Sequence, residues 1–154
     1  MTRVELVREV QRYFTLHELV DRPTYEKYGA FAWHFFDTRM LESLFVIRDK
    51  IIKKPMTINN WHMGGKFSQR GLRTNLSPEV LAKTKENKLS MSAHSTGKGW
   101  DFDVKGMTAE EVRQEIIKQG GKLPHPIRLE KDVTWVHADI YNDGKEAKVT
   151  QFKV

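Results

Sequence analysis

The segment from Ser92 to Val104 carries two potential metal ligands on either side of a glycine turn, and this restricts how the chain around it folds. His94 precedes glycines at positions 97 and 99, whereas Asp101 belongs to the hydrophobic run Trp100 to Val104. This pattern predicts a loop that leads into a strand, so that His94 and Asp101 point to one spot. An imidazole nitrogen and a carboxylate oxygen held together are two of the three protein ligands of a typical catalytic zinc site.

A histidine in a second predicted strand provides a third ligand. The segment Thr134 to Tyr141 alternates with period two, as expected of a half-buried strand. Its apolar face consists of Val136, Ala138 and Ile140, and its other face of Trp135, His137 and Asp139. His137 therefore leaves the strand on the side away from the core. His62 and His125 are alternative ligands, because a chain with six histidines offers many chance pairings.

Two neighbouring carboxylates are candidates for a supporting role in such a site. Asp103 and Asp139 each lie two residues beyond a proposed ligand on the same strand face. They are candidates for orienting an imidazole by accepting its second N–H group. Roles in solvation or in capping a turn fit the pattern equally well.

The order Ser-x-His-x-x-Gly-x-Gly-x-Asp followed by Trp-x-His resembles the zinc D-alanyl-D-alanine peptidases. This group includes the vancomycin-resistance dipeptidase, bacterial carboxypeptidases, phage endolysins and, distantly, the hedgehog signalling domain. The resemblance covers about half the chain, and Gly99 stands where the family usually has alanine. It implies zinc bound by His94, Asp101 and His137. It also implies an α+β fold, in which a small, mainly antiparallel sheet carries the site and helices pack on its other face.

The general base is the point at which the sequence departs from this family. The peptidases with the best-defined chemistry carry Glu-x-x-His, but the corresponding position here is Thr134. Other branches have the glutamate a few residues further upstream, which leaves Glu130 and Asp132 as candidates. A hairpin with residues 131–134 as its loop would place Glu130 opposite Trp135, on the face of the last histidine. We therefore expect Glu130 to be the base, since Asp132 would lie in the turn with a shorter side chain.

The resemblance also implies an arginine that holds the substrate. A predicted strand at residues 56–61 leads into a polar loop that contains Arg70 and Arg73. The family places its substrate-binding arginine in this order, because a guanidinium donates paired hydrogen bonds to a carboxylate or oxyanion. The pattern does not distinguish Arg70 from Arg73, and a solvated surface position is as good an interpretation of either one alone.

Apolar spacing and capping signals predict the remaining elements. A core helix of about 15 residues begins at Asp37 and ends before Pro55. Three further helices are expected: a short one from Thr15 that ends before Pro23, one from Ser77 to Lys85, and one from Thr108 to Gln119. Residues 1–13 fit helix or strand. A strand at 127–130 pairs with the one ending at Tyr141, and a tight turn at 142–145 returns residues 147–154 as an edge strand.

Composition limits the classes of function. The 154 residues fit one domain, and the absence of cysteine excludes disulfides and thiol catalysis. Without a signal peptide or an apolar run long enough to span a membrane, we expect a cytoplasmic product that reaches a cell wall through phage lysis or virion delivery. The net charge of +6 suits anionic surroundings such as peptidoglycan. Because the basic residues are scattered, we do not expect nucleic acid as a partner.

These features and the resemblance together predict a zinc metallopeptidase of the carboxypeptidase or endolysin type. Its substrate would be a peptide bond in peptidoglycan, which contains D-amino acids. We expect the protein to be a monomer. The alternative retains the fold and the zinc but not the catalysis, because Glu-x-x-His is absent: a phage module that binds wall peptides without cutting them.

Overall fold

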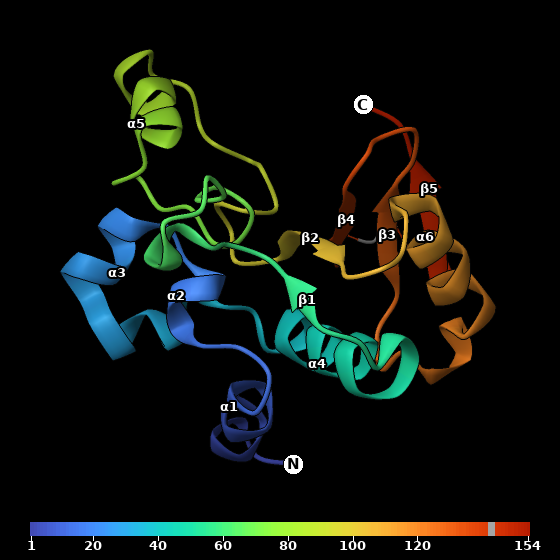
Figure 1. The fold of residues 1–154 in the computed structure, drawn as a ribbon. Helices are drawn as coiled ribbons and strands as arrows, with labels where there is room; N and C mark the ends of the chain where they lie inside the picture. Colours follow the sequence, from blue (N-terminus) through green and yellow to red (C-terminus); the bar gives the residue numbers. More distant parts are fainter. Residues whose placement is uncertain (142–143) are drawn as a thin grey trace.

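The computed structural model describes residues 1–141 and 144–154 and has an α+β fold (Figure 1). The α-helices are α1 (Arg3–Gln11), α2 (Leu16–Leu19), α3 (Arg22–Tyr28), α4 (Thr38–Val46), α5 (Pro78–Lys85) and α6 (Ala109–Lys118). Shorter helical segments are η1 (Gly29–Phe35), η2 (Ile47–Ile52), η3 (Trp61–Met63) and η4 (Gly120–Lys122). The strands are β1 (Met56–Thr57), β2 (Gly99–Val104), β3 (Ile127–Glu130), β4 (Val136–Asp139) and β5 (Val149–Phe152). No helix in this part of the chain is long and apolar enough to cross a bilayer.

The strands form one mixed sheet in the order β1-β2-β4-β3-β5. All neighbouring strands are antiparallel except β3 and β5, which are parallel. The expectation of a mainly antiparallel sheet with a C-terminal edge strand is therefore confirmed. The tight turn expected at 142–145 includes two residues that lie outside the described part of the chain.

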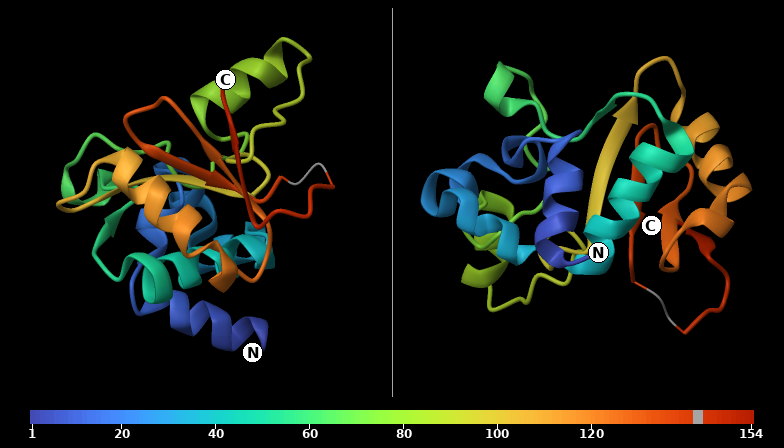
Figure 2. Two further views of the ribbon diagram at one scale, coloured as in Figure 1. Left: turned by 90° about the vertical axis from the view of Figure 1, so that its right-hand side faces the viewer. Right: turned by 90° about the horizontal axis from the view of Figure 1, so that it is seen from below.

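The core lies between this sheet and the helices beneath it. Trp100 and Phe102 of β2 are fully buried, because alternate residues of the strand face inward. Apolar residues of α4, η2 and α6 belong to the same cluster, among them Leu41, Leu44, Ile47, Val112 and Ile116. The views in Figure 2 place α5 on the opposite side of the sheet from α4. The face of the sheet toward α4, η2 and α6 is thus covered by helices, and the candidate site lies on the opposite face.

The predicted helices are confirmed, with one irregularity. The core helix begins at Thr38 as α4 and continues into η2, a π-helix that ends at Lys53 in the left-handed conformation. Capping boxes start α2 and α6 at Thr15 and Thr108, where the side chain and a glutamate three residues later bond reciprocally to the backbone. The first residues, which fitted helix or strand, form α1.

Two strand predictions are wrong in detail. The strand expected at 56–61 stops at Thr57, because Asn59 and Asn60 direct their backbone N–H groups to Glu18 and Phe67 rather than to a neighbouring strand. Asn59 also binds the Val20 carbonyl through its side chain. These contacts tie the segment to the N-terminal helices and end the pairing with β2.

The register of the β3–β4 hairpin also differs from the prediction. Arg128 lies opposite Asp139, and continuation of this register places Glu130 opposite His137 rather than Trp135. The connection therefore spans residues 131–135, one residue more than expected. Asp132 within it adopts a positive φ of 64°, which lets the chain turn. A shift of two residues keeps Glu130 on the predicted face.

Gly97 is the residue at which the loop before β2 tolerates no side chain. Its φ is +69°, and an added Cβ would lie 2.1 Å from the Phe35 carbonyl oxygen. We predict that Gly97→Ala lowers the free energy of unfolding by at least about 2 kcal/mol, because it adds backbone strain to a steric clash. Urea unfolding measures this change. The matched control is Gly121→Ala, since a Cβ at Gly121 meets no atom within 4 Å. Equal stability of the two variants would contradict the prediction.

Candidate metal site

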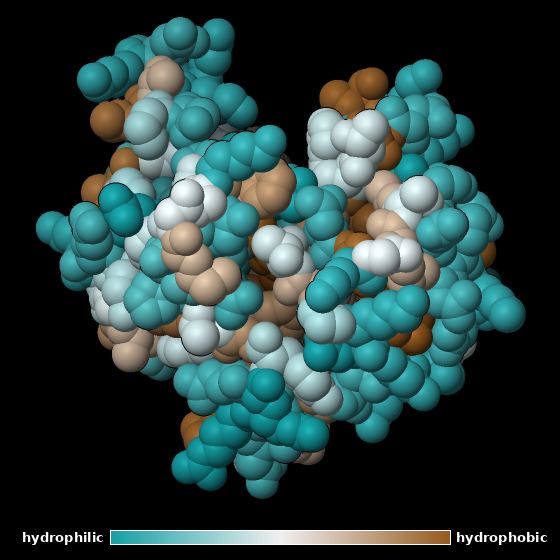
Figure 3. All heavy atoms as spheres, viewed as in Figure 1, coloured by the Kyte–Doolittle hydropathy of each residue, from teal (hydrophilic) through white to brown (hydrophobic). Residues whose placement is uncertain are grey.

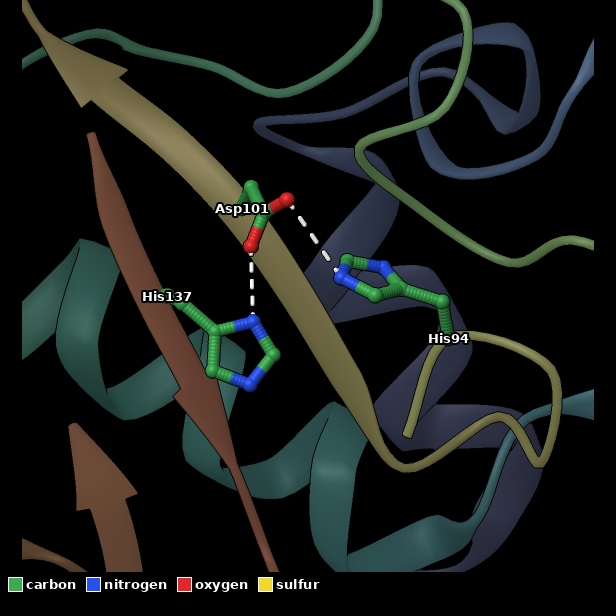
Figure 4. A group of neighbouring side chains, drawn as sticks. All are labelled: His94, Asp101 and His137. Carbon is green, nitrogen blue, oxygen red and sulfur yellow. Dashed lines mark hydrogen bonds and ion pairs between the residues drawn. The ribbon is translucent and has the colours of Figure 1, made fainter. Parts of the chain in front are cut away.

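Three side chains from different parts of the chain converge above β2 (Figure 4). His94 lies in the loop before β2, Asp101 in β2 and His137 in β4, where it is the direct cross-strand partner of Asp101. Each of the three offers a ligand atom, and these atoms lie within 4.8 Å of one another. Asp101 bridges the imidazoles: Oδ2 is 3.3 Å from His94 Nε2, and Oδ1 is 2.7 Å from His137 Nδ1. The group predicted from the sequence is therefore assembled and could hold a metal ion.

The loop that carries His94 is held by its own backbone and by its neighbours. The His94 N–H donates to Ser92 Oγ, and Lys98 N–H donates to the Ala93 carbonyl. At Gly99, the position where the resembling family usually has alanine, a Cβ would lie 2.7 Å from Ala93 Cβ. Glycine there allows the loop to close tightly and brings His94 over Asp101.

The backbone fixes the tautomer of His94. Its Nδ1 lies 3.0 Å from the Gly71 carbonyl oxygen, which only accepts hydrogen bonds, so Nδ1 carries the proton. Its other ring nitrogen, Nε2, faces Asp101 Oδ2 at 3.3 Å. Metal-binding histidines are commonly held by such an outer hydrogen bond. His94 is 5% exposed, so this arrangement is shielded from water.

His137 lies between two carboxylates. Its Nδ1 faces Asp101, and its Nε2 is 2.9 Å from Asp139 Oδ2. Burial by itself lowers the pKa of His137, but the hydrogen bonds to Asp101 and Asp139 and their negative charges raise it to about 9. For Asp101 burial has the opposite effect and raises the pKa, because it disfavours the charged carboxylate. The hydrogen bonds from the two histidines outweigh burial and hold the pKa of Asp101 well below the ordinary value. Without a metal, His137 is therefore an imidazolium at neutral pH.

Asp139 is the supporting carboxylate that the sequence offered as one alternative. It accepts two hydrogen bonds from Arg128, at 2.9 and 3.0 Å, in addition to the one from His137. Burial raises its pKa, but these partners lower it overall. Asp103 has a different role, because it pairs with Arg70 at 2.7 Å. Only one of the two candidate carboxylates thus orients an imidazole.

The three residues open into a cavity of about 300 Å³. Glu130 and Trp135 line it, and no ion pair of the Glu130 carboxylate is found in the part of the chain that the structure describes. Its remaining lining is Met91, Ser92, Ala93, Arg128, Asp139, Tyr141, Phe152 and Val154. The space-filling view shows a hollow between the part that carries α5 and the part that carries the C-terminus (Figure 3).

The other predicted residues lie outside this lining. Asp132 is exposed and lies 3.5 Å from Lys153. The Arg70 guanidinium stacks on Phe67 and pairs with Asp103. Arg73 flanks the site through its backbone N–H, which donates to the His94 carbonyl. Its Nε is buried and has no hydrogen-bond partner among the described residues.

The alternative histidine ligands are used elsewhere. His62 stacks against His17, with ring centroids 5.1 Å apart. His125 bonds to Glu42. Neither belongs to the metal-ligand group found in the described residues.

Two residues of the site were missed in the sequence. Arg128 follows from the alternation of residues 127–130, which places it on the same face as Glu130 and opposite Asp139. Tyr141 gave no local signal. Its hydroxyl lies 2.9 Å from Thr96 Oγ1 and 3.0 Å from the Met91 carbonyl oxygen, which ties the His94 loop to the end of β4.

Comparison with known proteins adds no relative to this description. No family model matches the chain, and neither a curated protein nor a solved structure does. The interpretation of the site therefore depends on its own geometry and on the resemblance of its motifs.

We predict that His137→Ala lowers the affinity for zinc by about 100-fold or more, because it removes one of three protein ligands. Metal analysis after dialysis and a competing chelator measure this loss. His125→Ala is the control, since His125 bonds to Glu42 and not to the ligand group. A parent protein that takes up no zinc, or equal loss in both variants, would refute the site.

Zinc binding should release about one proton at pH 7, because the raised pKa of His137 keeps its ring protonated until a metal displaces the proton. The apparent affinity should then rise with pH and level off above about pH 9. Calorimetry in buffers of different ionisation enthalpy measures the proton count. Asp139→Asn removes one carboxylate that raises this pKa, so it should reduce the release. An affinity independent of pH between about 6.5 and 9 would be evidence against the arrangement.

Proposed function

We propose that the protein is a zinc-dependent peptidase that cuts a peptide bond in a peptidoglycan-type substrate. The observation that carries the proposal is the convergence of two imidazoles and one carboxylate in a cavity that Glu130 also lines. The Ser-x-His and Trp-x-His motifs, which resemble the zinc D-alanyl-D-alanine peptidases, contribute the substrate class. The site geometry and the motif resemblance do not depend on overall sequence similarity to another protein.

The donor set suits zinc. His94 Nε2, His137 Nδ1 and one Asp101 oxygen would hold the ion, a combination that leaves a position for water or substrate. The outer bonds from Nδ1 of His94 to Gly71 and from Nε2 of His137 to Asp139 hold both rings in the required tautomers. A bound zinc ion would polarise the scissile carbonyl and make water more acidic.

Glu130 is the proposed general base. It faces the cavity from β3, directly across from His137, so its carboxylate is positioned to accept a proton from the attacking water. The same carboxylate would then return that proton to the leaving amine. Asp132 is a weaker candidate, because it lies at the exposed turn beside Lys153.

Arg73 is the proposed substrate-binding arginine. Its backbone is bonded to the ligand loop at His94, and its buried Nε has no hydrogen-bond partner among residues 1–141 and 144–154. Arg70 is already engaged by Asp103 and Phe67. A guanidinium with donors left over can bind a substrate carboxylate or the developing oxyanion.

The second candidate function is a zinc-binding module that holds wall peptides without cutting them. It is favoured by Thr134, which occupies the position of the glutamate in Glu-x-x-His. It predicts zinc-dependent binding of peptidoglycan peptides with no release of product. Incubation of the zinc-loaded protein with purified peptidoglycan, followed by chromatography of soluble fragments, separates the two functions.

Glu130→Gln should retain zinc but lose hydrolysis by about 100-fold or more, since the amide cannot accept the proton of water. Product release from peptidoglycan measures the rate, and metal analysis verifies the site. The control is Asp132→Asn, which should stay within about threefold of the parent, because removing an exposed charge has little effect. Full activity of the Glu130 variant would exclude it as the base, and loss in the Asp132 variant alone would assign that role to Asp132.

A further inference from the structure

Arg113 is a buried cation that lies outside the candidate site. It belongs to α6, on the helix-covered side of the sheet, and only 3% of its surface is exposed. Its neighbours at the inner positions of the helix are Val112 and Ile116, both fully buried and apolar. Burying a cation is costly unless its donors are satisfied, so the contacts of this guanidinium identify its role.

Two of those contacts are to the loop between β3 and β4. Nη1 donates to the Trp135 carbonyl at 3.1 Å, and Nη2 donates to the Val133 carbonyl at 3.2 Å. The third contact is to Glu110, whose side chain is largely exposed. The planar guanidinium therefore holds two carbonyls of alternate residues, an arrangement that requires a defined loop conformation.

The loop held in this way borders the site. It begins directly after Glu130 and ends at Trp135, two residues before His137, and Trp135 lines the cavity. Its other end is fixed by the Lys131 N–H, which donates to the Phe152 carbonyl of β5. Trp135 is partly exposed, so packing alone does not fix it. The bonds from Arg113 to the Trp135 and Val133 carbonyls restrain the loop at this end.

We propose that Arg113 is a positioning residue, which sets the place of the Trp135 wall against the substrate from the opposite side of the sheet. The peptidase part of this inference rests on the proposed function, but the positioning of Trp135 does not. Arg113 contacts none of the three ligand residues. Its loss should therefore affect substrate binding and leave metal binding unchanged.

The test compares Arg113→Met and Arg113→Lys in the full-length, zinc-loaded protein labelled with fluorotryptophan. The chain has four tryptophans, and Trp135→Phe assigns the resonance of interest. In Arg113→Met the Trp135 resonance should shift or broaden while the other three keep their positions. KM for peptide should rise about tenfold, with kcat and zinc affinity within about threefold. The Trp135 shift and the KM of Arg113→Lys should lie between those of the parent protein and those of Arg113→Met. The reason is that an ammonium retains the charge of the guanidinium but not its paired donor geometry.

Gln114→Met on the same helix is the matched control, since Gln114 is exposed and bonds to Glu110 but not to the loop. An unchanged Trp135 resonance and KM in a folded Arg113 variant would overturn the proposal. A shift of all four resonances would also overturn it, because that would indicate a general structural role. If the parent protein cuts no peptide, the proposed function fails, whereas the resonances still decide whether Arg113 positions Trp135. If Arg113→Met does not fold, Arg113→Lys provides the same comparison.

Discussion

The pairing of β2 with β4 is the constraint on which the candidate site depends. It places Asp101 and His137 directly opposite each other on the solvent-facing side of the sheet, while Trp100 and Ala138 fill the core on the other side. A shift of either strand by one residue would turn its functional side chain inward. The apolar face of the sheet therefore enforces the register that the metal ligands require, and stability and function depend on the same strand pairing.

A chain of charged groups extends from this pair in both directions. Arg128 holds Asp139, Asp139 holds His137, and Asp101 connects His137 to His94. Such a network orients each ring before a ligand arrives, which reduces the reorganisation needed on binding. It also gives the metal-free site a proton on His137, in the place where a cation would otherwise neutralise the carboxylates. The site is thus arranged around a positive charge in either state.

The proposed base lies on β3 and not at the position three residues before His137, which Thr134 occupies. Thr134 lies before β4, where it lines a neighbouring cavity with Arg113, whereas Glu130 reaches the site from β3. The loop that joins the two strands borders the candidate site at Trp135, and the buried Arg113 holds it through two backbone carbonyls.

Local patterns were sufficient to predict much of this protein. The alternation of residues 134–141 predicted that His137 and Val136 lie on opposite faces of β4, because side chains of a strand point alternately to its two faces, and His137 does pair with Asp101. The expectation of a half-buried strand is wrong, since all four residues of β4 are buried. Capping boxes at Thr15 and Thr108 located two helices, since they depend only on residues three positions apart. The glycines before β2 indicated the loop that brings His94 over Asp101.

Tertiary structure decided what depends on residues far apart in the chain. The end of β1 follows from a hydrogen bond between Asn59 and Val20, near the N-terminal helices. The five-residue loop between β3 and β4 is held by hydrogen bonds from Arg113 in α6. The choice of Asp139 over Asp103 as the partner of an imidazole was also undetermined locally, because Arg70 engages Asp103 from another segment. Sequence spacing therefore determined which side chains face the site, whereas long-range hydrogen bonds determined which of them meet.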